Sequence, residues 1–207
     1  MHLLFIGNSF TARNDLPGRL AKLAAERGHR VTHDLISAGG ASLRAHWNKG
    51  SALEAIGKGR YDHVVLQEQS TLPIRNARRF HENVRLFIEP IRASGATPVL
   101  YLTWARKNAP ATQRALTDAY TAIAGETGAL LVPVGIAWAA YLAGHARPLL
   151  HDKDLSHPSP AGTYLAACVF FAALFHESPV GLGCDVAGVS GAEAQAMQQV
   201  AWRTVSG

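Results

Sequence analysis

The sequence predicts an α/β protein, a three-layer α/β/α sandwich built on a parallel sheet. Short apolar segments alternate along the chain with longer segments in which apolar residues recur at helical spacing. Successive apolar segments are separated by enough chain for a helix, which is typical of right-handed crossovers between parallel strands. With 207 residues, of which 48% are hydrophobic and 17% charged, the chain can bury a sizeable core without disulfides or metals.

Five short segments predict the strands. Most are rich in apolar residues and end at polar or turn-forming residues. The apolar character of residues 63–66 is typical of a strand that is buried on both faces. In chain order, the segments are residues 3–6, 30–36, 63–66, 98–102 and 130–132.

Seven segments predict helices, from capping residues and apolar stripes. Asn14 and Asp15 can cap the first, and Gly28 ends it. The third has its apolar residues on one stripe between Phe80 and Ile91, which predicts a helix that packs one face on the sheet. In chain order, the segments lie between Asp15 and Gly28 and at residues 43–56 (short and weakly defined), 80–91, 112–126, 136–143, 161–175 and 192–203.

Five strands connected in this way predict a flavodoxin-like sheet with the strand order 2-1-3-4-5. The chain contains no internal repeat, low-complexity segment or linker, so residues 1–207 are expected to form a single domain. In such a sheet the functional residues lie in loops beyond the carboxyl ends of the strands, near the point where the strand order reverses.

Charge and hydropathy exclude several classes of protein. The 20 Lys and Arg exceed the 15 Asp and Glu, giving a formal charge of +5, but the excess is scattered. Its densest part, residues 75–79, has three arginines and no aromatic residue to stack on a base, so no nucleic-acid partner is expected. The longest apolar stretch, residues 165–175, is too short for a membrane span. Residues 1–6 contain no export signal, so a cytoplasmic protein is expected, although a processed exported form would begin in the same way.

No metal or cofactor is expected. His81 and Glu82 begin like a zinc-protease helix, but Arg85 occupies the position where the second histidine is required. The chain has neither a glycine-rich phosphate loop nor a dinucleotide-binding turn. Cys168 and Cys184 fit no metal or redox spacing, and the sequence leaves open whether they pair.

Residues capable of chemistry are concentrated in the segments that follow the predicted strands. These segments should face the same edge of the sheet. A late loop with two aspartates and a histidine is expected to join them there. The segments are residues 7–10, 39–42, 67–70, 103–106 and 152–158.

Together these segments contain the groups that acyl transfer by a serine requires: a hydroxyl, an imidazole, a carboxylate that orients the imidazole, and donors for the oxyanion. Ser9 supplies the hydroxyl. His157 supplies the imidazole, with Asp154 three residues earlier. The backbone N–H groups of Ser9 and Gly40 and the side-chain amide of Gln69 are the expected oxyanion donors.

The same segments resemble the sequence blocks of the GDSL, or SGNH, hydrolase family. Residues 7–10 resemble its nucleophile block, with Asn8 where the family usually has aspartate. Residues 40–42 resemble its glycine block, and residues 154–157 its Asp-x-x-His block. The third block, commonly Gly-x-Asn-Asp, departs from the pattern, because residues 67–70 are Gln-Glu-Gln-Ser. The resemblance extends over nearly the whole chain and implies the same sandwich fold and ester hydrolysis.

Two of these assignments have alternatives. Asp152 could replace Asp154 as the carboxylate that orients the imidazole, although the family's three-residue spacing favours Asp154. Gln69 takes the place of the family's asparagine. Gln67, two residues earlier, is the alternative donor.

We therefore expect a serine esterase that forms an acyl-enzyme with a small-molecule ester. Trp104 and Arg106 are expected substrate contacts, although Trp104 is equally consistent with packing. Few large apolar residues follow the strands, which favours short acyl groups, and an acetylated carbohydrate is the leading candidate. The alternatives are a lipase or thioesterase of the same family and a non-catalytic binding domain of the same fold. The sequence leaves open the acyl and alcohol groups of the substrate and the oligomeric state.

Overall fold

The computed structural model describes all residues, 1–207, and has a five-stranded parallel sheet at its centre. The strand order is β2-β1-β3-β4-β5, so the predicted order is confirmed. In the centre of the sheet, Leu4 lies between Asp34 of one neighbouring strand and Val64 of the other. The strands are β1 (His2–Gly7), β2 (Thr32–Ser37), β3 (His63–Leu66), β4 (Thr97–Tyr101) and β5 (Leu130–Val132).

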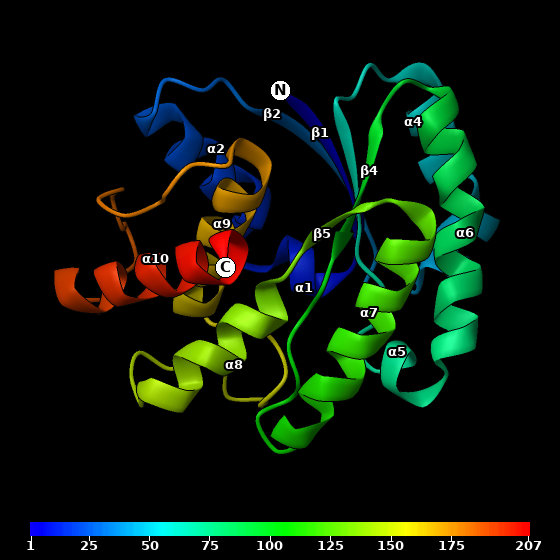
Figure 1. Ribbon diagram of the computed structural model, residues 1–207. Helices are drawn as coiled ribbons and strands as arrows, with labels where there is room; N and C mark the ends of the chain where they lie inside the picture. The colour runs from blue at the N-terminus through cyan, green and yellow to red at the C-terminus, as the bar shows by residue number, and fades with distance from the viewer.

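Helices cover both faces of the sheet and make three layers, as predicted (Figure 1). One face is covered by α2 (Leu16–Glu26), α8 (Val134–Gly144), α9 (Pro160–Phe175) and α10 (Gly191–Ser206). The other face is covered by α3 (Leu43–Lys49), α4 (Ser51–Lys58), α6 (Ala77–Ala93) and α7 (Gln113–Thr127). Short helical turns in the loops are α1 (Ser9–Ala12), η1 (Arg13–Asp15), α5 (Leu72–Arg75) and η2 (Pro110–Thr112).

Alternate residues of the central strands face the two helical layers. In β1, Leu3 and Phe5 belong to the core that includes α2 and α9, whereas Leu4 and Ile6 belong to the core that includes α6 and α7. All four side chains are fully buried. Burial on both faces is the physical reason for the unbroken apolar run in this strand.

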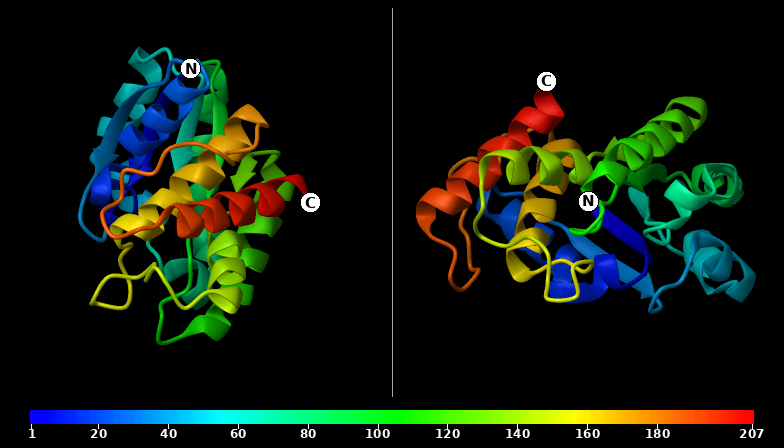
Figure 2. Two further views of the ribbon diagram at one scale, coloured as in Figure 1. Left: turned by 90° about the vertical axis from the view of Figure 1, so that its left-hand side faces the viewer. Right: turned by 90° about the horizontal axis from the view of Figure 1, so that it is seen from below.

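Helix α9 is apolar on every side because protein surrounds it. Residues 161–174 are all buried, and α2, α8 and α10 pack against the helix. Figure 2 shows α10 lying alongside α9. A helix that is covered all round needs no polar face. No helix in the chain is both long and apolar enough to cross a membrane.

Two local predictions were wrong. Residues 43–56 do not form one helix, because Gly50 has a φ of 80°, a left-handed conformation that ends α3 and allows α4 to begin at Ser51. Helix α5 was not predicted, because a helix of four residues is too short to show a hydrophobic period.

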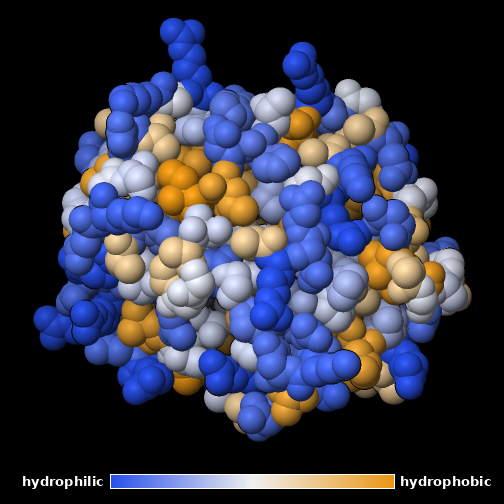
Figure 3. Space-filling view, turned by 180° about the vertical axis from the view of Figure 1, so that it is seen from behind, coloured by the Kyte–Doolittle hydropathy of each residue, from blue (hydrophilic) through white to orange (hydrophobic).

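The surface seen in Figure 3 is mostly hydrophilic, with hydrophobic side chains in small patches. Most apolar side chains lie in the two cores instead. The exposed large hydrophobic residues of the chain are Leu35, Ile136, Leu142, Leu149 and Leu155.

The carboxyl ends of the strands lie at one edge of the sheet, the lower edge in Figure 1. Because the strands are parallel, the loops that follow them emerge together at this edge. The loop between α8 and α9 returns to the same place, where the N–H group of Lys107 donates a 2.9 Å hydrogen bond to the carbonyl oxygen of Leu155. An isolated bridge between His151 and Pro158 closes this loop. The fold therefore brings the late loop to the edge where the earlier ones meet.

Candidate active site

Ser9 lies directly after β1, as the first residue of α1. Asn8 caps this helix, because its Oδ1 accepts a 3.0 Å hydrogen bond from the N–H group of Phe10. The N–H group of a first helical residue has no acceptor within the helix, and no other protein group accepts from Ser9. The turn therefore leaves both the hydroxyl and the N–H group of Ser9 available at the edge of the sheet.

Ser9, His157 and Asp154 form a continuous chain of hydrogen bonds. Ser9 Oγ lies 2.8 Å from Nε2 of His157. The other ring nitrogen, Nδ1, is hydrogen-bonded to Oδ2 of Asp154. The fold thus brings together the hydroxyl, imidazole and carboxylate that the sequence analysis selected, although Ser9 and His157 are 148 positions apart.

The carboxylate of Asp154 is held by the loop that contains the histidine. Its Oδ1 accepts hydrogen bonds from the N–H groups of His157 at 2.9 Å and Ser156 at 3.0 Å. The bonds from the backbone and ring of His157 hold the pKa of Asp154 well below its usual range. Asp152, the alternative carboxylate, makes no hydrogen bond to the ring and instead accepts one of 3.2 Å from Arg13. The geometry therefore favours Asp154 as the orienting group.

Aromatic packing fixes the position of the histidine loop. The indole of Trp104 is stacked between Phe10 and Trp138, with ring centroids 4.9 Å and 3.8 Å away. Its N–H group donates a 3.0 Å hydrogen bond to the carbonyl oxygen of Ser156. Only 2% of Trp104 is exposed. Of the two roles considered for this residue, packing is therefore the main one.

The loop after β2 is attached to the turn that contains Ser9. The side chain of Asn8 donates a 3.0 Å hydrogen bond from Nδ2 to the carbonyl oxygen of Ala41. Gly40 has a φ of 65°, a left-handed conformation that favours glycine. Its N–H group is exposed and donates to no protein acceptor. Gly40 is thus free to donate to a substrate.

Gln69 has one end of its amide fixed and the other end free. Its Oε1 accepts hydrogen bonds from the N–H group of Thr71 at 2.9 Å, the hydroxyl of Thr71 at 3.0 Å and the N–H group of Leu72 at 2.9 Å. Its Nε2 donates to no protein acceptor. A donor whose orientation is fixed from the other end is suited to an oxyanion site.

Both amide atoms of Gln67, the alternative donor, are hydrogen-bonded to groups of the protein. It is fully buried, and its Oε1 accepts from the N–H group of Asn8 at 2.8 Å and the hydroxyl of Thr11 at 3.0 Å. Its Nε2 donates to the carbonyl oxygen of Glu68. The geometry therefore favours Gln69 over Gln67 as the side-chain donor to a substrate.

Comparison with known proteins adds a family to this geometry. No protein-family model and no curated protein matches the sequence. A structure from Slackia heliotrinireducens, described as an SGNH hydrolase, is 32% identical and has a TM-score of 0.73, covering 84% of this chain and 98% of its own. The chain belongs to the SGNH hydrolase family. The predicted family is thereby confirmed.

Two more distant structures have the fold of this SGNH hydrolase. A DUF4886 family protein from Bacteroides uniformis is 19% identical and has a TM-score of 0.79, over 100% of this chain and 95% of the other. A variant of an acetyl-xylooligosaccharide esterase from Geobacillus is 19% identical with a TM-score of 0.65, over 83% and 93% respectively.

The asparagine before Ser9 is a departure from the usual SGNH sequence that the structure explains. One amide does two things here, because Oδ1 of Asn8 caps α1 while Nδ2 donates to Ala41. An ionised aspartate could cap the helix but could not donate a hydrogen bond. The amide is therefore the group that joins the first two blocks of this hydrolase.

Glu68 supports the candidate site and was not predicted from the sequence. It is fully buried, and its Oε1 accepts from the N–H groups of Leu43 at 3.0 Å and Gln69 at 2.7 Å. Its Oε2 accepts a 2.8 Å bond from Asn83. Burial raises the pKa of Glu68, and these bonds with the charge of Arg79 oppose the rise. Glu68 thus joins the segment after the glycine loop to the third block. The sequence signal for it is an acidic residue placed directly after a buried strand.

Two buried histidines support the loops of the site without belonging to the hydrogen-bonded chain. Nε2 of His46 lies 2.7 Å from the carbonyl oxygen of Gly7, and Nε2 of His151 lies 2.9 Å from that of Ala105. Burial lowers the pKa of both histidines, which favours neutral rings that donate to these carbonyl groups.

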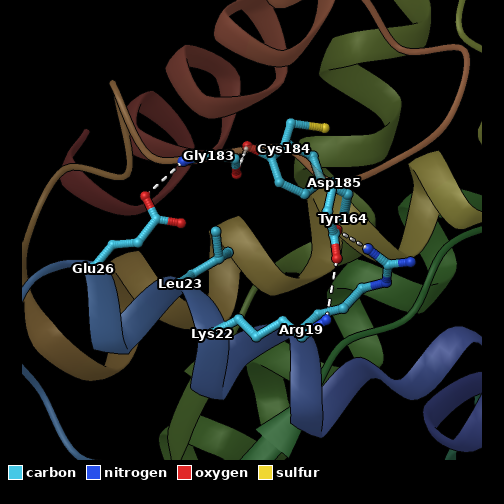
Figure 4. A pocket seen from close by; sticks show the side chains of 8 residues that line it. All are labelled: Arg19, Lys22, Leu23, Glu26, Tyr164, Gly183, Cys184 and Asp185. Atoms are coloured by element: carbon cyan, nitrogen blue, oxygen red, sulfur yellow. Dashed lines mark hydrogen bonds and ion pairs between the residues drawn. The ribbon is translucent and has the colours of Figure 1, made fainter.

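A separate cavity of about 310 Å³ lies away from the SGNH site, between α2, α9 and residues 183–185 (Figure 4). Asp185 pairs with both basic residues of the lining, accepting from Arg19 at 2.5 Å and from Lys22 at 3.2 Å. Glu26 accepts a 2.8 Å bond from the N–H group of Gly183. None of the expected catalytic residues lines it. This cavity is therefore separate from the candidate active site.

The two cysteines, whose pairing the sequence left open, are free thiols. Burial raises the pKa of both Cys168 and Cys184, so neither has an activated thiolate. No group of three or more His, Cys, Asp or Glu side chains is arranged to hold a metal ion.

Proposed function

We propose that this SGNH hydrolase is a serine esterase in which Ser9 is the nucleophile, His157 the general base and Asp154 the orienting carboxylate. The main support is the 2.8 Å contact between Ser9 Oγ and Nε2 of His157, whose Nδ1 is bonded to Asp154. A serine hydroxyl is a weak nucleophile at neutral pH. An adjacent base that is itself oriented by a third group activates it.

In the acylation step, Ser9 Oγ attacks the ester carbonyl carbon while Nε2 of His157 takes the proton. Asp154 stabilises the positive charge on the imidazole, because its low pKa keeps it ionised. Negative charge develops on the carbonyl oxygen. The N–H groups of Ser9 and Gly40 and Nε2 of Gln69 have no protein acceptor and would stabilise that charge.

The tetrahedral intermediate collapses when the bond to the alcohol oxygen breaks and His157 returns its proton to that oxygen. A water molecule then attacks the acyl-enzyme, and His157 takes a proton from it. The bond between the acyl carbon and Ser9 Oγ breaks, His157 returns the proton to Oγ, and the acid is released.

The proposed substrates are small esters with a short acyl group, and an acetylated carbohydrate is the leading candidate. The cavity beside the third block has a volume of about 200 Å³, which is small for a long lipid chain. One protein of the same fold is an acetyl-xylooligosaccharide esterase, which supports an acetylated sugar. A series of p-nitrophenyl esters from acetate to palmitate tests the acyl length. Activity that rises steadily toward palmitate would overturn the short-acyl proposal.

The hydrolysis of p-nitrophenyl acetate by the wild type and Ser9→Ala tests the serine mechanism. We expect the variant to lose on the order of 10³-fold or more in kcat, whereas Ser206→Ala, at the far end of α10, should retain activity. A fluorophosphonate probe should label Ser9 in the wild type, because only an activated serine reacts readily. Equal turnover by wild type and Ser9→Ala would refute the mechanism. Folded wild-type protein that is neither labelled nor active would favour a non-catalytic binding domain.

A further inference from the structure

A cavity of about 200 Å³ beside the candidate active site has two arginines on its walls and no acidic residue. The arginines are Arg75, at the end of α5, and Arg106, after β4. Both side chains are exposed, and neither makes a hydrogen bond or ion pair with the protein. By contrast, Arg85 on α6 holds Glu126 with bonds of 2.6 Å and 2.7 Å. Two unpaired arginines therefore line a cavity that has no acidic residue on its walls.

Contacts on the cavity walls connect this space to the reacting groups. Thr71, on one wall, donates hydrogen bonds to Oε1 of Gln69, the proposed oxyanion donor. Trp104, on another wall, stacks on Phe10, the residue after Ser9, and donates to the carbonyl oxygen of Ser156. A substrate held at Ser9 therefore has part of its structure next to this cavity.

None of the remaining wall residues is charged. Ile74, Ala105 and Ala109 supply apolar surface on the same walls as the two arginines. The carboxylates closest in sequence to His157 are already engaged, Asp154 by the ring and Asp152 by Arg13. Neither arginine forms an ion pair within the protein, and a guanidinium group is the side chain best suited to bind a carboxylate through two parallel hydrogen bonds.

We propose that Arg75 and Arg106 bind an anionic group of the substrate, so that this hydrolase prefers esters that carry a carboxylate over neutral esters of the same size. The inference rests on the proposed esterase function and adds to it the charge of the substrate. The chemistry required is a negative charge attached through a short apolar or sugar-like segment to the ester. The carboxylate belongs either to the alcohol or to the acyl group, and the experiment separates these two cases.

The test compares pairs of esters that differ in charge but hardly in size. In the first arm, the charge is on the alcohol: 4-acetoxybenzoate is compared with 4-acetoxybenzamide. In the second arm, it is on the acyl group: mono-4-nitrophenyl adipate is compared with the corresponding monoamide. The quantity measured is the ratio of kcat/KM for the anionic ester to kcat/KM for the neutral ester, after subtraction of uncatalysed hydrolysis.

In one of the two arms we expect a wild-type ratio of about fivefold or more at low salt. Exposed ion pairs are worth only a modest factor each, and two arginines act together here. Raising the salt to about 0.5 M should lower the ratio, because exposed charges are then screened. Arg75→Ala and Arg106→Ala should each lower the ratio, and the double variant should bring it close to one. Arg106→Lys should keep part of it.

Arg203→Ala on α10 is the matched control, because it removes an exposed arginine that does not line the cavity. It should leave both activity and ratio unchanged. Ratios at or below one in both arms, in a protein that hydrolyses the neutral esters, would overturn the anion site and leave the esterase proposal standing. A folded wild-type protein that hydrolyses none of the esters would overturn the esterase proposal instead. In that case calorimetric binding of 4-hydroxybenzoate against 4-hydroxybenzamide still tests the cavity, and equal affinity for the two would overturn it.

Discussion

The side-chain amide of Asn8 donates a 3.0 Å hydrogen bond to the carbonyl oxygen of Ala41. This bond crosses from the turn after β1 to the loop after β2, so it fixes the position of Gly40 relative to Ser9. Two of the proposed oxyanion donors are the N–H groups of these residues. The amide of Asn8 therefore controls the spacing of the donors, while its own Oδ1 and Nδ2 are both hydrogen-bonded within the protein.

Replacement of Asn8 by aspartate should add a loss of kcat at higher pH that the wild type does not show. A protonated carboxyl can donate to Ala41, but an ionised one cannot and would face a carbonyl oxygen. Position 8 is buried, and burial beside a carbonyl oxygen should raise the pKa of the new carboxyl above the ordinary aspartate range. We therefore expect kcat of Asn8→Asp, divided by that of the wild type, to fall by about tenfold as the pH rises from about 5 to about 8. Asn8→Ser keeps a capping oxygen and cannot ionise, so its ratio should be low but independent of pH. A constant ratio for Asn8→Asp would show that the bond to Ala41 is not needed.

The two aspartates of the late loop should differ sharply in their effect on turnover. Asp154→Asn removes the charge beside the imidazole and should lower kcat on the order of 10³–10⁴-fold. Asp152→Asn disturbs only a surface contact with Arg13 and should change kcat by no more than about threefold. Steady-state hydrolysis of p-nitrophenyl acetate measures both. The reverse order would transfer the orienting role to Asp152.

The low pKa of Asp154 has a consequence for the dependence of activity on pH. Its carboxylate remains charged through the acidic range, because the backbone and ring of His157 donate to it. As the pH falls through the acidic range, Asp154 should therefore take up no proton of its own and should add nothing to the loss of activity. The acid limb of log kcat/KM should therefore have a slope of about one. A slope near two would mean that a second proton binds at an essential group.

Gln69→Glu tests the Nε2 donor separately from the structural bonds that Oε1 of the same side chain accepts. Glutamate retains an oxygen to accept the bonds from Thr71 and Leu72, but it replaces the Nε2 donor with a second oxygen. We expect kcat to fall by about 10²-fold or more with little change in KM, because the interaction strengthens only as charge develops on the substrate.

Gln67→Ala should act on stability instead. It removes the buried acceptor of the Asn8 N–H group, and the free energy of unfolding should fall by about 2–4 kcal/mol. Urea denaturation of both glutamine variants, measured beside their kinetics, separates the two roles. A Gln67→Ala protein that unfolds like the wild type but has lost kcat would transfer the donor role to Gln67.

Glu68 should make the folded state less stable as the pH rises. Burial raises its pKa in the folded state, so the folded protein binds this proton more tightly than the unfolded chain does. Its contribution to stability is therefore greatest below the ordinary glutamate pKa and declines as the pH rises through the folded-state value. In Glu68→Gln this decline should be absent.

The comparison is made by measuring the free energy of unfolding of wild type and variant between about pH 3 and about pH 8. Glu126→Gln is the control with the opposite sign, because hydrogen bonds from Arg85 lower the pKa of Glu126. The difference between wild type and Glu126→Gln should therefore grow as the pH rises from the acidic end. A Glu68→Gln protein with the same pH dependence as the wild type would show that Glu68 titrates normally.

The strands and most helices could be predicted because local pattern determines them. Residues 63–66 and 130–132 coincide with β3 and β5, since each is a short apolar run with polar or turn residues around it. The break between α3 and α4 at Gly50 could not be predicted, because a glycine inside a helical pattern does not reveal its φ. Helix α5 has too few residues for any period.

In the candidate site, sequence spacing located the groups, but their supporting contacts could not be predicted. Ser9, Asp154 and His157 stand out because their types and order match a known requirement of acyl transfer. The bonds from Asn8 to Ala41 and from Leu43 to Glu68 join residues 33 and 25 positions apart, and no local pattern specifies them. The buried hydrogen bonds of Gln67 likewise follow from the pairing of β1 with β3 and not from its neighbours in the sequence.

The 148 positions between Ser9 and His157 also have a consequence during protein synthesis. At about 5–20 residues per second, Ser9 is translated roughly 7–30 s before His157. On the proposed mechanism, the nascent chain should therefore be unable to hydrolyse esters while the first strands are assembling. Recovery of turnover after dilution from denaturant should likewise be a late signal, because it reports the docking of the histidine loop and not the formation of the sheet.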